Sequence, residues 1–277
     1  MRNIRLTLSY EGTEFFGWQR QPNVPTVQGC VESAIEKIVA ERVTLYGSGR
    51  TDAGVHALNQ VANFKTASSI PADGLTKALN NLLPSTVRVR SACDAAESFH
   101  ARHDARCKTY RYRILGAPIA SPFLARFVHH LPYPLDHQRM AAAARLLEGE
   151  HDFTSFAGSA NQVREPFLTE KVDDRADGVD APCEPDSRQP TTDSRSNVRT
   201  IFSSRILWRP RTSILVYEVC GSGFLHHMVR NLVGTLIEVG RGKLAPRDVL
   251  EILAARDRTR AGLTAPASGL ILVQVEY

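Results

Sequence analysis

The order of strand-like and helical segments along this chain predicts an α+β protein made of two similar halves. Three observations support that fold class. Runs with two-residue alternation open each half, runs with three- and four-residue apolar spacing follow them, and the same order of segments occurs twice. The 277 residues are enough for two modest domains, which we expect at 1–106 and 107–277.

The first half is expected to contain four strands and two helices. Residues 3–10 alternate between apolar and polar side chains, as in a strand with one buried face. Thr26 is a typical helix N-cap, and apolar residues recur at helical spacing from there to Val39. A second helix over 75–82 ends before Pro84, which cannot continue a helix. The other strands are expected at 43–46, 60–65 and 87–92.

The second half shows the same order with one extra helix. Asp136 is a suitable N-cap for a helix that runs to Leu147. A longer helix is expected from Phe224 to Val239. Pro246 is expected at the first position of the extra helix, because its restricted backbone suits that position. The strands are expected at 110–114, 200–208, 214–219 and 270–277.

This repeated order, β-α-β-β-α-β, matches the ferredoxin-like or split βαβ arrangement. It predicts antiparallel sheets with helices on one face and a cleft between the halves. RNA-binding domains of the RRM type use such a sheet to hold nucleobases. The same arrangement serves unrelated functions, so the fold alone does not decide the activity.

The charge of the chain is unevenly distributed. The formal net charge is +5, but residues 173–198 carry seven acids and three arginines, a net of −4, which leaves +9 for the rest. A body this basic suits a polyanionic partner such as nucleic acid. The acidic stretch is poor in large apolar residues, so we expect a mobile insertion or a disordered loop there.

Several classes of protein are disfavoured. No apolar run approaches the roughly 18 residues of a transmembrane helix, and the N-terminus lacks the apolar core of a signal peptide, so a cytoplasmic protein is expected. The five cysteines show no Cys-x-x-Cys spacing, and no phosphate-binding or dinucleotide-binding glycine motif occurs. His226 and His227 would point about 100° apart on a helix and make a poor metal pair. No cofactor and no metal are therefore expected.

The segment Gly49–His56 is the first candidate for chemistry. It holds Asp52 between two glycines, in a stretch that favours a sharp turn over a helix or strand. A nucleophilic carboxylate must stay ionised, and a buried cation would ensure that. Arg50 is the cation nearest in sequence. The alternative is an ordinary surface turn with one local ion pair.

Two further segments carry candidate residues. Around Tyr110, aromatic and basic side chains alternate, which suits stacking on bases together with contacts to phosphates. The alternative is an ordinary strand with tyrosines in the core. Arg230 stands among apolar residues with no acid after it until Glu238, and a buried arginine needs a carboxylate or phosphate partner. The alternative places Arg230 on an exposed helix face.

Residues 49–56 resemble the signature of the TruA family of tRNA pseudouridine synthases. Further segments that resemble this family run nearly from end to end of the chain, at 10–13, 16–19, 108–112, 197–201, 224–231 and 269–270. In the family, the strand that begins at Val198 follows the preceding element more closely than it does here. The intervening acidic stretch leaves these motifs intact, so deletion of 175–195 is expected to preserve activity.

The resemblance implies isomerisation of uridine to pseudouridine at positions 38, 39 and 40 of the tRNA anticodon stem-loop. Asp52 would be the catalytic carboxylate and Arg230 its basic partner. Tyr110 would be the ring that stacks on the target base, and it could assist removal of the proton from C5. Arg50 is a candidate for substrate binding. The family works without a cofactor, as a homodimer in which each RNA spans both subunits.

Two rival functions and one mechanistic choice stay open. The chain could be a non-catalytic RNA-binding module on the same scaffold, or a pseudouridine synthase with another RNA target. The carboxylate of Asp52 could attack C1′ of the ribose or remove a proton from C2′.

Overall fold

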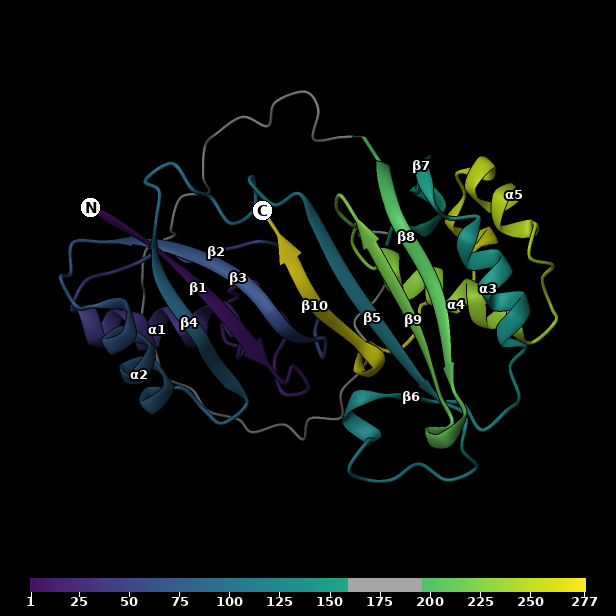
Figure 1. Cartoon of the computed structure of the whole chain (residues 1–277), viewed down its shortest axis with the longest axis horizontal. Coiled ribbons are helices and arrows are strands. Elements are labelled where there is room, and N and C mark those ends of the chain that lie inside the picture. The colour runs from purple at the N-terminus through teal and green to yellow at the C-terminus, as the bar shows by residue number, and fades with distance from the viewer. Residues whose placement is uncertain (159–195) are drawn as a thin grey trace.

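The computed structural model describes residues 1–158 and 196–277, which share one mixed sheet (Figure 1). Within these residues the strands follow the order β4-β1-β3-β10-β5-β9-β8-β7, with β2 paired to β3 and β6 paired to β5. None of the described helices has the length and apolar character needed to cross a membrane. Residues 173–195 of the acidic stretch lie outside the described residues, so the expected loop and the effect of its deletion stay predictions.

The first half has the expected order of elements. They are β1 (Arg2–Tyr10), α1 (Val27–Val39), β2 (Tyr46–Gly47), β3 (His56–Thr66), α2 (Ala72–Leu82) and β4 (Val87–Ala95). Strand β1 pairs antiparallel with both β3 and β4. Thr26 caps α1, because its side chain accepts a hydrogen bond from the backbone N–H of Gly29. The spatial order β4-β1-β3-β2 is that of a ferredoxin-like half.

The expected strand at 43–46 is shorter in the structure. Only Tyr46 and Gly47 pair with β3. The backbone N–H groups of Val43 and Leu45 instead donate to the carboxylates of Glu36 and Glu32 on α1. Since helix side chains satisfy these groups, residues 43–45 need no neighbouring strand.

The second half repeats the order with additions. Its elements are β5 (Cys107–Leu115), β6 (His129–His130), α3 (His137–Arg145), β7 (Gly149–Asp152), β8 (Val198–Arg209), β9 (Ile214–Gly221), α4 (Met228–Gly240), α5 (Asp248–Ala255) and β10 (Leu270–Glu276). The spatial order β10-β5-β9-β8 repeats that of the first half. Asp136 caps α3 by accepting from the backbone N–H groups of Gln138 and Arg139. The predicted α+β fold of two ferredoxin-like halves is confirmed.

Two helix starts differ from the prediction. Helix α4 begins at Met228 rather than Phe224, because His227 has a left-handed backbone with φ 57° and interrupts the helical path. Helix α5 begins at Asp248, with Arg247 as its N-cap, so Pro246 lies before the helix. The Asp248 carboxylate accepts from the backbone N–H of Ala245, which closes a turn around the proline.

The last strand of the chain joins the two halves. β10 pairs antiparallel with β5 and parallel with the start of β3, where Ile271 and Leu272 face His56 and Ala57. Side chains from both halves, including Leu6, Phe64 and Leu236, belong to one buried core. In Figure 1, α1 and α2 lie on the first half and α3, α4 and α5 on the second. The division into domains at residue 106 stays a prediction.

Candidate active site

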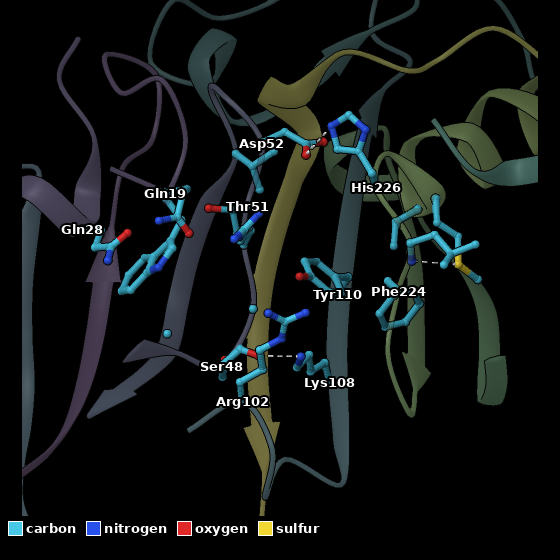
Figure 2. A pocket seen from close by; sticks show the side chains of 18 of the residues that line it. Gln19, Gln28, Ser48, Thr51, Asp52, Arg102, Lys108, Tyr110, Phe224 and His226 are labelled. Carbon is cyan, nitrogen blue, oxygen red and sulfur yellow. Dashed lines mark hydrogen bonds and ion pairs between the residues drawn. The ribbon is translucent and has the colours of Figure 1, made fainter. Parts of the chain in front are cut away.

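Asp52 lies in a tight loop between β2 and β3. The backbone N–H of Val55 donates to the Asp52 carbonyl at 3.1 Å, and Gly54 has a positive φ of 78°, a conformation that glycine adopts at little cost. The loop therefore needs a glycine at position 54, two residues after Asp52. The turn carries the Asp52 side chain to the junction of the two halves (Figure 2).

Residues 15–18 hold this loop from the side. The backbone N–H of Trp18 donates to the Thr51 carbonyl at 3.0 Å, and that of Gly54 donates to the Phe15 carbonyl at 3.2 Å. Gly17 lies so close that an added Cβ would stand 2.6 Å from the Thr51 carbonyl oxygen. The backbone on either side of Asp52 is thus fixed by long-range hydrogen bonds.

Three side chains from the other half surround the Asp52 carboxylate. Arg230 Nη1 lies 3.3 Å from Oδ2, His227 Nε2 lies 3.5 Å from Oδ2, and His226 Nε2 lies 3.7 Å from Oδ1. The Asp52 side chain is 19% exposed and that of Arg230 is 10% exposed. Arg230 is held in place because its Nε donates to the Ala265 carbonyl at 2.7 Å.

The turn before α4 explains why both histidines reach Asp52. The left-handed backbone of His227 stacks the two imidazole rings, with centroids 3.8 Å apart. Burial lowers the pKa of His227 below its usual value, and the opposing effect of Asp52 is smaller, so His227 is neutral at pH 7. The sequence pattern missed the histidines as neighbours of Asp52 because it extended the helix back to Phe224.

The Asp52 carboxylate and the two histidines could together contact a metal ion. Their ligand atoms lie within 4.8 Å of one another, and this is the single such group in the described part of the chain. The prediction that the histidines make a poor metal pair relied on helical geometry that these residues do not have. The Arg230 guanidinium opposes a cation at this point, because it lies 3.3 Å from the same carboxylate.

Tyr110 lies on β5, in the same cavity as Asp52. The residue is 7% exposed, and its ring packs edge-on against that of Phe224 at 5.1 Å. Burial raises the pKa of the Tyr110 phenol, and the charge of Asp52 raises it further. The phenol is therefore neutral at physiological pH.

Arg50 is not the partner of Asp52. Although it is nearest in sequence, it is exposed, and the cation within 4.0 Å of Asp52 is Arg230, 178 residues away. Arg50 does line the cavity that contains Asp52 and Tyr110. It thus stays a candidate for contact with a substrate.

The cavity between the halves has a volume of about 760 Å³. Its walls include Asp52, Tyr110 and Arg230 together with three other basic residues, which are Arg50, Arg102 and Lys108. Known ligand pockets span about 300–1,000 Å³. The cavity is large enough for a nucleotide and combines a carboxylate with aromatic and basic walls.

Comparison with known proteins gives a family for this chain. The model of a family described as tRNA pseudouridine synthase matches residues 7–104 and 185–277. The chain belongs to that family. The matched ranges contain Asp52 and Arg230, whereas Tyr110 falls between them. Pseudouridine synthases isomerise uridine, so the protein belongs to a family of isomerases that modify tRNA.

Individual relatives match over the whole chain. The chain is 46% identical to the tRNA pseudouridine synthase A of Solibacter usitatus over 277 residues, all of both proteins. It is 41% identical to the proteins of the same name from Caldicellulosiruptor bescii and Brevibacillus brevis, again over the full length of each. The family assignment therefore covers both halves of the fold.

Proposed function

We propose that this protein converts uridines 38, 39 and 40 of the tRNA anticodon stem-loop to pseudouridine, with Asp52 as the catalytic carboxylate. The observation that carries the proposal is the position of Asp52. It is partly exposed in a nucleotide-sized cavity, 3.3 Å from a fixed guanidinium, and a buried aromatic residue, Tyr110, lines the same cavity. The family assignment supports the reaction class, and the basic body of the chain supports an RNA substrate.

The reaction requires few groups from the protein. The C1′–N1 bond of uridine breaks, the uracil turns, C5 bonds to C1′, C5 loses its proton and N1 gains one, so that the product is an isomer of the substrate. Asp52 would either attack C1′ or remove a proton from C2′, and both routes need an ionised carboxylate. The guanidinium of Arg230 lies 3.3 Å from Oδ2, close enough to hold the carboxylate in place by a charged hydrogen bond.

Tyr110 would hold the base while it is detached. A ring that packs on Phe224 and lines the same cavity can stack on uracil. Because burial raises the pKa of Tyr110, its phenol stays protonated at neutral pH and has no phenolate with which to accept the C5 proton, so stacking and hydrogen bonding are its favoured roles. A uridine in the stem must first leave the helix at a cost of a few kcal/mol. Contacts between basic residues and phosphates would offset that cost.

We further propose that the protein acts in the cytoplasm as a homodimer, with each RNA contacting both subunits. In the described part of the chain, β7 pairs with β8 over Val198–Ile201, and no described strand pairs with the rest of that edge. Phe202, Leu207 and Trp208 on that strand are exposed, and such edges favour pairing with another chain. Light scattering should give the mass of a dimer, and a fully active monomer would contradict this arrangement.

The test of function is pseudouridine mapping on an anticodon stem-loop transcript incubated with the pure protein. We expect modification at positions 38–40 without added cofactor. Pseudouridine at other sites of cellular RNA would instead support a different RNA target. Tight RNA binding without any pseudouridine would support the non-catalytic module.

A further inference from the structure

A second group of basic side chains lies in the cavity at the end away from Asp52. Lys108 precedes Tyr110 by two residues on β5, so both side chains project from the same face of the strand. Figure 2 shows Asp52 above Tyr110, with Lys108 and Arg102 below it. Arg102 is exposed and lines the same cavity.

Among the residues that the structure describes, Lys108 has few partners for a partly buried ammonium group. Its Nζ donates to the Ser48 carbonyl at 2.6 Å, which uses one of three N–H donors. Within the described parts of the chain, the charges that shift its pKa are those of Arg102 and Arg199, both of which are positive. Burial together with these cations lowers the pKa of Lys108 to about 8.

Such an arrangement is costly unless an anion completes it. Like charges that converge in a half-buried site repel one another, and each loses part of its hydration. An uncharged nucleobase would accept hydrogen bonds from one or two of these cationic side chains, but the repulsion between their positive charges would stay in place. A phosphodiester carries a full negative charge and has two free oxygens, so it can accept from Lys108 and Arg102 together.

We propose that Lys108 and Arg102 bind the phosphodiester on one side of the uridine whose ribose lies at Asp52. This inference rests on the proposed function, because that function places a nucleotide in the cavity. Tyr110 then stands between a ribose site and a phosphate site. The basic end of the cavity orients the extruded nucleotide, and Asp52 acts on it.

The test pairs a change in the protein with a change in the RNA. Anticodon stem-loops would carry a neutral methylphosphonate in place of one phosphate, either 5′ or 3′ of the target uridine or at a distant loop position. For wild-type protein, one of the two flanking substitutions should weaken binding about 10- to 100-fold, as expected for a hydrogen bond between charged groups. The distant substitution should have a small effect.

Lys108→Gln and Arg102→Gln should each weaken binding of unmodified RNA and lose most of the sensitivity to that same methylphosphonate. Such non-additivity marks a direct contact. Lys77→Gln is the matched control, since Lys77 is exposed on α2 and loses the same charge. It should keep the full sensitivity of the wild type.

Two outcomes would overturn the inference about the phosphate site. A third would contradict the proposed reaction and leave the phosphate site intact. If Lys108→Gln and Arg102→Gln stay as sensitive as the wild type to every neutral linkage, the phosphate lies elsewhere. Equal tolerance of both flanking substitutions by the wild type would exclude the contact as well. If the binding effects appear as expected but natural RNA gains no pseudouridine, the phosphate site stands and the proposed reaction fails. Because Arg102 is exposed, its variant tests the site even if Lys108→Gln folds poorly.

Discussion

The Asp52 loop (residues 49–56) and the α4 turn (residues 221–231) reach the same cavity from opposite halves, but they are held differently. The loop is fixed through its backbone, by hydrogen bonds with residues 15–18 in which Trp18 donates to Thr51 and Gly54 donates to Phe15. The partners of the Asp52 carboxylate come from the other half. The α4 turn carries a side chain that is itself fixed, because Arg230 donates to the Ala265 carbonyl.

The difference between the Asp52 loop and the α4 turn shows how the two halves contribute to the site. One half supplies a carboxylate at a defined point, and the other supplies the charge that acts on it. The contact between Asp52 and Arg230 depends on β10. This strand pairs with the start of β3, and it follows Ala265, whose carbonyl accepts from Arg230. The site is therefore sensitive to changes in either half, and the following predictions separate the two contributions.

The largest effect is expected from Asp52→Asn, which removes the charge with almost no change in volume. Pseudouridine formation should fall at least about 10³-fold, because no other described carboxylate lies within 4.0 Å of Arg230 to replace it. Binding of the stem-loop RNA should change little, since the proposed phosphate contacts do not involve Asp52. Single-turnover assays and binding titrations measure the two effects. Turnover within tenfold of the wild type would refute the assigned role.

Arg230→Lys should lower the single-turnover rate by about 10²-fold or more. A lysine ammonium cannot both donate at the position of Nε to Ala265 and reach Asp52 as the guanidinium does. Arg258→Lys is a useful comparison, because Arg258 supports Asn231 and Thr264 beside α4 without contacting Asp52. An Arg230→Lys variant with a normal rate would show that the guanidinium geometry is dispensable.

Gly234→Ala should destabilise the second half. An added Cβ would lie 1.7 Å from the Leu263 carbonyl oxygen, so α4 or the segment around Leu263 must shift. We expect a loss of at least about 1–3 kcal/mol in the free energy of unfolding, measured by denaturant titration. Gly74→Ala is the matched control in the first half, where the nearest atom would be at an ordinary 3.6 Å. It should be neutral or slightly stabilising, and equal losses in both variants would contradict the close packing.

The smallest effect is expected from pH. Because the pKa of Lys108 is lowered to about 8, the group is charged below that pH and loses its charge above it. Affinity for the stem-loop RNA should therefore fall several-fold between pH 7 and pH 9, and Lys108→Gln should show a flatter profile. Identical profiles for the two proteins would remove Lys108 from the RNA interface.

Local patterns predicted what depends on local interactions. Thr26 and Asp136 cap their helices as expected, because a cap bonds to backbone groups within three residues. The strand over 43–46 and the start of α4 were wrong because distant atoms decide them. Glu32 accepts from Leu45, and the backbone N–H of Gly158 donates to the His226 carbonyl. Apolar periodicity continues through both places and carries no trace of those partners.

By itself, the sequence determined the order of the elements, the α+β class, the turn around Asp52 and the candidates Tyr110 and Arg230. Those features follow from side-chain spacing and from the backbone freedom of glycine. Only the tertiary structure decided that Arg230, and not Arg50, is the cation beside Asp52, and that two histidines join it. The reason is physical. A charge pair forms between groups that the sheet brings together, and here the junction of β3 with β10 sets that distance rather than separation along the chain.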